Sequence, residues 1–447
     1  MTPINLSKIL TLALLVTCTT QHLNAQVIAA SKPDQHTTLA EVWNNALQYN
    51  KSIQIKQLQA EAKAEDIKDA KAERLPEINA EGEYARVSNM PLFENGLLHA
   101  HGQFPVLHTF YKVGGDAYLN LYSGDKINLK IKTEETLNQI RQEQKNMTVA
   151  DVKLKTAAYF LELQKSYQFK KLIMSHIADQ EKQILQIKQL LKNGVVLKSD
   201  LLRAELQLSR DKLTLTQIEN DIQIESQKLD ILTGQPDEAV INPDTLADVE
   251  LLTVKSYDEY LLQAQANSFQ NKISEQQTNL SKVALKTTKG NLAPKVGLFA
   301  NYAYSYPQIQ FYPYGDALFG LGMAGIKASF ALDGFYHNKH KVKAAELELK
   351  SQELEHSDQQ DRVRQQVKEA FLRYQEALNR IRVARVNIAQ AKENARIVYN
   401  TYFNQLSLVT DLLDSDTALL QSQFELTSAQ IATQMQYYQL QNVIGNL

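Results

Sequence analysis

Alternating polar and apolar residues predict four β-strands, two in each half of the chain. The alternating segments are residues 77–87, 114–122, 295–305 and 320–332. In the first, the odd-numbered positions are polar, namely Glu77, Asn79, Glu81 and Glu83. A period of two is typical of a strand with one apolar face. Each segment has roughly the nine to eleven residues of a tilted, membrane-spanning strand.

Two very long helices are predicted after the strand pairs. Residues 126–192 and 335–404 contain neither glycine nor proline. At 1.5 Å per residue, the first would be about 100 Å long. Apolar residues at three- and four-residue steps late in it predict a coiled-coil seam, which needs neighbours along its length. We expect Gly194 to end this helix and Ser199 to cap the next, and we expect single helices over 39–74 and 257–290.

The two halves of the chain repeat one another. Residues 193–202 resemble residues 404–413 in sequence, and the register shift of 211 then holds without a gap to the end of the chain. A unit of over ~200 residues is too long for a solenoid repeat. We therefore predict a first structural repeat over 26–234, a linker over 235–256 and a second structural repeat over 257–447.

Four strands per chain cannot close a barrel. Open strand edges cannot face lipid, because their unpaired backbone groups have no water to bond. Three chains would supply about 12 strands, enough to enclose a water-filled lumen. We expect the polar positions of 77–83 to face that lumen. The positions expected to face lipid are Ile78, Tyr84, Leu119, Leu121, Leu298 and Tyr302. The alternative is a soluble four-stranded sheet packed on helices.

The N-terminus predicts export. Lys8 precedes an apolar run over 9–16, and Ala25 offers a cleavage point, so we read 1–25 as a signal peptide. The only cysteine, Cys18, lies inside it, and whether Cys18 is lipidated stays open. No later stretch has about 18 consecutive apolar residues, so no transmembrane helix is predicted. The net charge of −2 gives no indication of nucleic acid as a partner.

Three features together identify a family resemblance. They are the duplication, the Ser/Asp-Gly junctions at Gly124 and Gly334, and the motif Gly-x-x-x-x-Ser/Thr-Asp-x-Leu over 194–202. In these the mature chain resembles the outer membrane efflux proteins, the TolC-like channels of Gram-negative bacteria. The resemblance implies a mainly α fold with a small β part: very long α-helical coiled-coil hairpins, plus four transmembrane β-strands per chain. Three chains would form a 12-strand β-barrel and an α-helical periplasmic tunnel.

The function implied by the resemblance is a passive export duct in the cell outer membrane. It would serve a tripartite efflux or type I secretion system and would have no enzymatic activity and no cofactor. The implied partners are two further copies in a homotrimer, outer membrane lipid, a periplasmic adaptor (membrane fusion) protein and an inner-membrane transporter. The alternative is a periplasmic coiled-coil scaffold or tether without a channel. The exported cargo is not predicted.

The resemblance also implies functional residues at the helical turns. The expected adaptor contacts are Gly194, Val195, Val196 and Leu197 in one turn and Gln405, Leu406, Ser407 and Leu408 in the other. Gln405 stands where the family often has glycine, so that turn could have a different geometry. Asp411 and Asp414 would ring the periplasmic aperture, with Asp416 a weaker third candidate. Alternatively, Asp411 only complements the start of a helix and Asp414 is solvated.

Histidines are the remaining candidates for metal ligands. They are His99, His101 and His108 in the first loop, and His337 and His340 after the last strand. Neither group has cysteine or carboxylate partners at ligand spacing, so we predict solvated side chains and no metal site. No phosphate-binding loop or nucleophile elbow is present in the sequence.

Overall fold

The computed structural model describes residues 37–94, 96–98, 102–104, 106–237, 239, 241–244, 254–308 and 315–447. The predicted signal peptide and Cys18 lie outside these residues. The first half contains α1 (Leu39–Tyr49), α2 (Lys51–Ala72), β1 (Glu77–Arg86), β2 (Met90–Leu92), β3 (Gly102–Phe104), β4 (Thr109–Tyr122), α3 (Lys126–Lys192) and α4 (Lys198–Thr233). The second contains α5 (Tyr257–Asn267), α6 (Phe269–Lys289), η3 (Gly290–Leu292), β5 (Lys295–Tyr306), β6 (Phe319–Ser329), α7 (Gly334–Phe403) and α8 (Val409–Val443).

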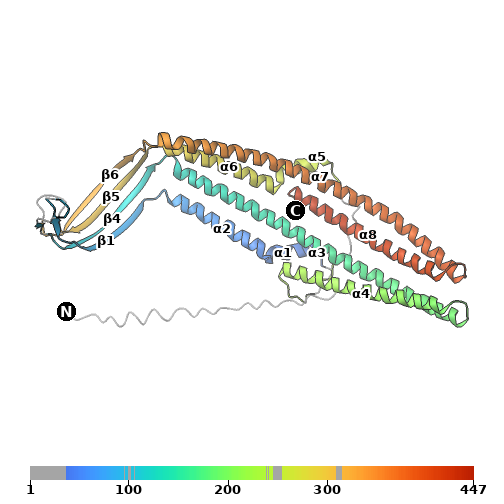
Figure 1. Cartoon of the computed structure of the whole chain (residues 1–447). Helices are drawn as coiled ribbons and strands as arrows, with labels where there is room; N and C mark the ends of the chain where they lie inside the picture. Colours follow the sequence, from blue (N-terminus) through green and yellow to red (C-terminus); the bar gives the residue numbers. More distant parts are fainter. Residues whose placement is uncertain are drawn as a thin grey trace, which may run out of the picture.

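The molecule is long and thin, with its sheet at one end and two helical hairpin turns at the other (Figure 1). Helices α3 and α7 run from the sheet to these turns with 67 and 70 residues. Both agree with the long helices expected from the absence of glycine and proline. Beside them, α4 and α8 return from the turns and end about half-way along the molecule, while α2 and α6 cover the half near the sheet.

The sheet has the antiparallel order β1-β4-β5-β6. Across it, Asn79 lies opposite Asp116, and Asp116 lies opposite Asn301, so one face is polar. The other face exposes apolar and aromatic side chains, namely Ile78, Tyr84, Val113, Leu298, Tyr302, Tyr304 and Ile326. The predicted alternation is therefore confirmed on β1, β4 and β5, whereas β6 places Phe319, Leu321 and Met323 on the polar face.

Several predicted boundaries are wrong. Strand β4 begins at Thr109, not at 114, and β6 ends at Ser329, not at 332. The stretch 90–108, expected to be a loop, contains the small hairpin of β2 and β3. Residues 39–74 are two helices that break at Asn50, whose side chain accepts a hydrogen bond from the backbone of Ser52. Residues 257–290 also break, at Ser268.

The helices form a curved layer. Near the turns the neighbours follow the order α4-α3-α8-α7, and near the sheet α2-α3-α6-α7. Buried clusters join them: Ile173, Ile177 and Ile218 meet Leu420 between α3, α4 and α8, and Tyr374 packs with Leu440 between α7 and α8. This burial of apolar side chains is the main stabilising term of the layer.

One buried group is poorly accommodated. Asp230, in the last turn of α4, is fully buried, and neither of its carboxylate oxygens has a hydrogen-bond partner among the described residues. Burial, with a smaller contribution from the charge of Asp237, raises the pKa of Asp230 to about 6. The folded protein therefore holds this proton more tightly than the unfolded chain, whose carboxyl has an ordinary pKa of 3.8. The associated stability is complete below pH 4 and is lost as pH rises through 6.

We predict that Asp230→Asn makes the protein more stable at pH 7.5 by about 1–2 kcal/mol, because the variant buries no charge. It should also remove the decline in stability between pH 4 and 7. Chemical unfolding of the detergent-solubilised protein at a series of pH values measures both effects. Asp221→Asn, at an exposed position of the same helix, is the matched control. An unchanged decline in the Asp230 variant would contradict the assignment.

Candidate functional site: the two hairpin turns

The two turns have the same backbone geometry. Gly194 has φ +73° and Gln405 has φ +64°, both in the left-handed region. After each, a backbone N–H closes the helix end, from Val195 to the Leu190 carbonyl (2.9 Å) and from Leu406 to the Thr401 carbonyl (2.8 Å). The expectation that Gln405 could change the turn is therefore wrong. The chain instead places a non-glycine residue in the strained conformation.

An aspartate caps each returning helix. The Leu197 N–H donates to Asp200 Oδ2 (3.2 Å), and the Leu408 N–H donates to Asp411 Oδ2 (3.0 Å). The predicted capping role of Ser199 is wrong, because the N-cap position is Leu197, two residues earlier, and Asp200 in the first turn supplies the acceptor. Both carboxylates also lie at the positive end of their helix dipoles.

The aspartates of α8 differ in their surroundings. Asp414 follows Asp411 by three residues, which places both on one helix face, and both side chains are exposed. Asp414 has no hydrogen bond or ion pair with another described residue. Asp416 is turned inward and accepts a hydrogen bond from Gln183 of α3 (2.8 Å). The structure thus leaves Asp411 and Asp414 as a solvent-facing pair and removes Asp416 from it.

The eight predicted contact residues divide into exposed and supporting side chains. Leu197, Leu406 and Leu408 are 70 %, 78 % and 70 % exposed. Val196, in contrast, packs against the cluster that contains Ile187 and Leu412. The Ser407 hydroxyl hydrogen-bonds with the hydroxyl of Thr401 (3.2 Å). Each turn therefore presents large apolar side chains to the outside, held on a packed base.

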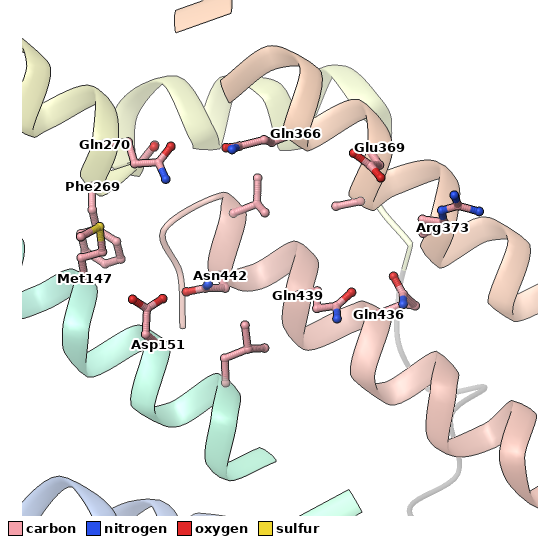
Figure 2. Close-up of a pocket in the computed structure, with 14 residues that line it drawn as sticks. Met147, Asp151, Phe269, Gln270, Gln366, Glu369, Arg373, Gln436, Gln439 and Asn442 are labelled. Carbon is pink, nitrogen blue, oxygen red and sulfur yellow. The ribbon is translucent and has the colours of Figure 1, made fainter. Parts of the chain in front are cut away.

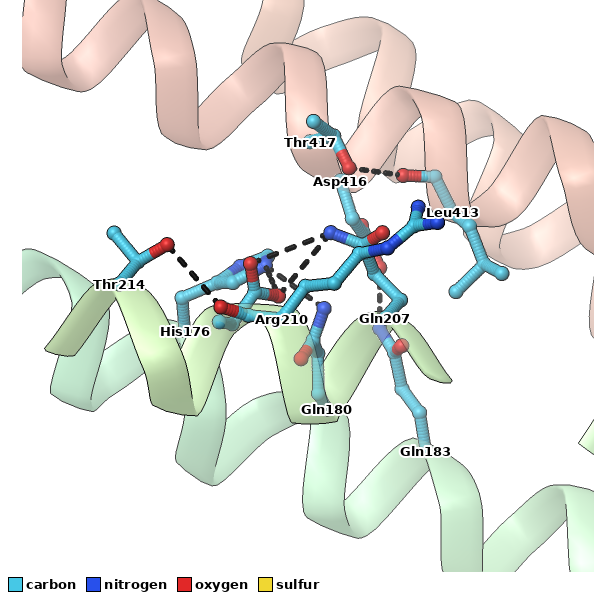
Figure 3. A network of polar contacts seen from close by, with 10 residues as sticks. His176, Gln180, Gln183, Gln207, Arg210, Thr214, Leu413, Asp416 and Thr417 are labelled. Carbon is cyan, nitrogen blue, oxygen red and sulfur yellow. Dashed lines mark hydrogen bonds and ion pairs between the residues drawn. The ribbon is translucent and has the colours of Figure 1, made fainter. Parts of the chain in front are cut away.

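A polar layer interrupts the apolar seam between the hairpins, roughly two to four turns of helix behind the tips. His176 Nε2 lies 3.4 Å from Asp211 Oδ2, and Gln180 Nε2 lies 3.0 Å from His176 Nε2 (Figure 3). Asp416 comes into this layer from α8. Burial raises the pKa of Asp416, while the hydrogen bond from Gln183 and the charge of His176 oppose the shift. Buried polar groups need partners, so this layer fixes how α3, α4 and α8 align.

A second polar region lies where α8 ends and α6 begins. Figure 2 shows this cavity of about 580 Å³, into which Asp151 of α3, Asn442 of α8 and Glu369 of α7 point. Glutamine side chains complete much of its wall. Arg373 at its rim is engaged by Glu376 (3.1 Å). The cavity holds no histidine, cysteine or paired nucleophile and base, so its lining offers no catalytic arrangement.

The described residues include no cluster of three or more His, Cys, Asp or Glu side chains placed to bind a metal ion. His99 and His101 lie outside them. No described helix has the length and apolar character required to cross a bilayer. The shared geometry of the two turns is therefore the clearest candidate for function.

The comparisons with known proteins agree with this geometry. Residues 42–235 match the model of the outer membrane efflux protein family. The match covers less than half of the chain and shows a similarity to that family over this segment. The family is not one of enzymes, in agreement with the prediction from the sequence. The sequence itself has no significant match among curated proteins.

Solved structures of outer membrane efflux proteins extend the similarity to nearly the whole chain. The structure is similar to CusC (TM-score 0.77, 13 % identity, 92 % of this chain and 92 % of that one). It is also similar to the outer membrane protein VceC from Vibrio cholerae (TM-score 0.74, 14 % identity, 91 % of this chain and 96 % of that one). A third similar structure is the open state of the MtrE outer membrane channel from Neisseria gonorrhoeae (TM-score 0.72, 14 % identity, 91 % of this chain and 88 % of that one). At these identities the similarity establishes the fold.

The turns offer a matched pair of substitutions. Gln405→Gly should relieve left-handed strain and stabilise its hairpin by about 0.5–1 kcal/mol. Gly194→Gln should cost about the same or more, through backbone strain alone, because the space around Gly194 is open. Hydrogen exchange at residues 185–200 and 396–411 measures the two effects separately. Equal protection in all three proteins would show that the left-handed conformations are not populated in solution.

Proposed function

We propose that the protein is a passive export duct of the outer membrane. Three copies would form a 12-strand barrel continued by a helical tunnel into the periplasm. The tunnel end would dock on a periplasmic adaptor and an inner-membrane transporter. The observation that carries the proposal is that each chain is an open layer with two unfinished edges, which run from the sheet to the turns.

The sheet edges are the first part of this observation. Among the described strands, the outer sides of β1 and β6 have no neighbour. An apolar, aromatic sheet face suits lipid only if such edges are paired. The edges also carry complementary charges on the polar face near the helices, with Glu77 on β1 and Lys327 on β6. Pairing β6 of one copy with β1 of the next would bring these ends together.

The helical edges continue the pattern. Helix α4 bears an unpartnered apolar stripe with the spacing of a coiled-coil seam, namely Leu206, Leu213, Ile224 and Ile231, each half exposed or more. Toward the opposite edge, α7 and α8 line a groove of about 1010 Å³ together with Phe169 of α3. Its wall includes Leu372, Val383 and Phe424. A stripe on one edge and a groove on the other fit a ring of identical copies.

The order of elements supports an internal two-fold repeat. Each proposed repeat, 26–234 and 257–447, supplies two strands of the sheet and one long helical hairpin, with 235–256 as the linker. Three chains would then form a tube of six similar units. This accounts for the nearly identical turns at Gly194 and Gln405, which would alternate around the tunnel mouth.

The exposed leucines at the turns support docking to a protein partner. Large apolar side chains that face water at the end of a coiled coil mark an interaction surface. We assign the adaptor contacts to the exposed members of the two turns, with Leu197, Leu406 and Leu408 as the main ones. Asp411 and Asp414 would form a ring of carboxylates at the mouth and attract cations.

Trimer formation is tested at the α4 edge. We predict that the double variant Leu206→Glu, Leu213→Glu converts the trimer to monomer, because charges would replace the apolar stripe. Sedimentation in detergent and heat-modifiable bands in the outer membrane fraction measure this. Leu185→Glu is the control, since Leu185 is 63 % exposed on α3, in the middle of the layer. A wild-type monomer in the soluble periplasmic extract would instead favour a scaffold or tether.

The mouth is tested by conductance. Asp411→Asn with Asp414→Asn should raise single-channel conductance in planar bilayers and increase the half-blocking concentration of divalent and trivalent cations about tenfold or more. Asparagine retains the capping acceptor, so the start of α8 should survive. Asp200→Asn, the equivalent cap of α4, is the matched control. Unchanged conductance and block would remove this role from the two aspartates.

A further inference from the structure

The polar face of the sheet is hollowed toward the end away from the helices. The hollow has a volume of about 430 Å³. Its floor combines residues of β4, β5 and β6. The ones that matter here are Phe110, Asp116, Asn301, Phe319, Leu321 and Met323. We call this the sheet hollow.

Strand β6 makes one side of the sheet hollow apolar. The register places Phe319 opposite Ser305, Leu321 opposite Ala303 and Met323 opposite Asn301. All three therefore lie on the same face as the polar residues of β1 and β4. A surface in contact with water alone has no need of three large apolar side chains at alternate positions. Such side chains are expected where a surface contacts apolar solutes.

The other side of the sheet hollow is acidic. Lys112 is occupied by an ion pair with Glu81. Asp116 accepts one hydrogen bond, from Asn79 (3.2 Å), and forms no ion pair within the described part of the chain. Glu83 lies opposite Lys112 on the same face, with no ion pair of its own among the described residues. The local balance is three carboxylates to one ammonium group.

We propose that the sheet hollow is a weak binding site for amphipathic cations, solutes with a positive charge and an apolar or aromatic body. The ring of Phe319 and the thioether of Met323 would contact the body, and Asp116 would balance the charge. The inference rests on the proposed duct and names a cargo class for it. In the ring of copies, β1 of the next chain would lie beside β6 and add its Glu81 and Glu83 to the open side of the sheet hollow.

The test uses three probe ions on single channels in planar bilayers. Tetraphenylphosphonium should interrupt the current at concentrations where tetraphenylborate, of the same size and opposite charge, does not. Tetramethylammonium, which has the charge without the aromatic body, should also fail at those concentrations. Weak binding is expected, because a conducting site must release its solute. Equal block by the two tetraphenyl ions would overturn the charge assignment.

Variants locate the block. Phe319→Ser with Met323→Ser, and separately Asp116→Asn, should each raise the half-blocking concentration of tetraphenylphosphonium about fivefold or more. Ile326→Ser is the control, since Ile326 lies on the opposite face of β6 and is 70 % exposed. Equilibrium binding of the same ion to solubilised trimers covers variants that do not insert. Block and binding unchanged in both hollow variants would overturn the site, whereas a wild type that forms no pore would overturn the duct itself.

Discussion

Unsatisfied edges are the constraint on which the rest of the structure depends. A strand edge presents backbone groups that must bond to something, and in lipid the only available partner is another strand. The same chain continues that edge as helix α4 with an uncovered leucine stripe. A single chain therefore buries the contact surfaces between its own neighbouring helices, but it leaves the two outer edges of the layer without a neighbour. The proposed closed assembly rests on this geometry more than on any single residue.

Two kinds of contact meet at the seam between the hairpins: apolar packing, which holds the helices together, and polar contacts, which fix their alignment along the seam. Leucine and isoleucine clusters on either side of the polar layer can slide along one another at little cost. The hydrogen bond from Gln183 of α3 to Asp416 of α8 does not allow such a shift, because a displacement by one turn would leave buried polar groups without partners. The layer therefore sets the relative height of the two turns. A docking partner meets both turns only if they lie at one level.

Much of this fold follows from two patterns in the sequence. Period-two alternation located β1, β4 and β5, and the lack of glycine and proline located α3 and α7. The break at Asn50 was missed because the residues on both sides favour helix, and only the cap geometry separates them. The Asp200 cap was missed in favour of Ser199 because the cap depends on where the helix begins. The sheet hollow depends on cross-strand register, which alternation in one strand does not reveal.

Only α3 and α7 span the whole distance from the turns to the sheet. The strips beside them are each made of two helices, α4 with α2 and α8 with α6, which meet near the middle. Each chain thus combines two continuous helical rods, α3 and α7, with two strips that are interrupted by a joint between helices. A sideways force on the turns is transmitted by the rods, while the joints allow the neighbouring strips to bend. The proposed tube would therefore be stiff along its length but able to widen at the end formed by the turns, by bending near the middle of the molecule.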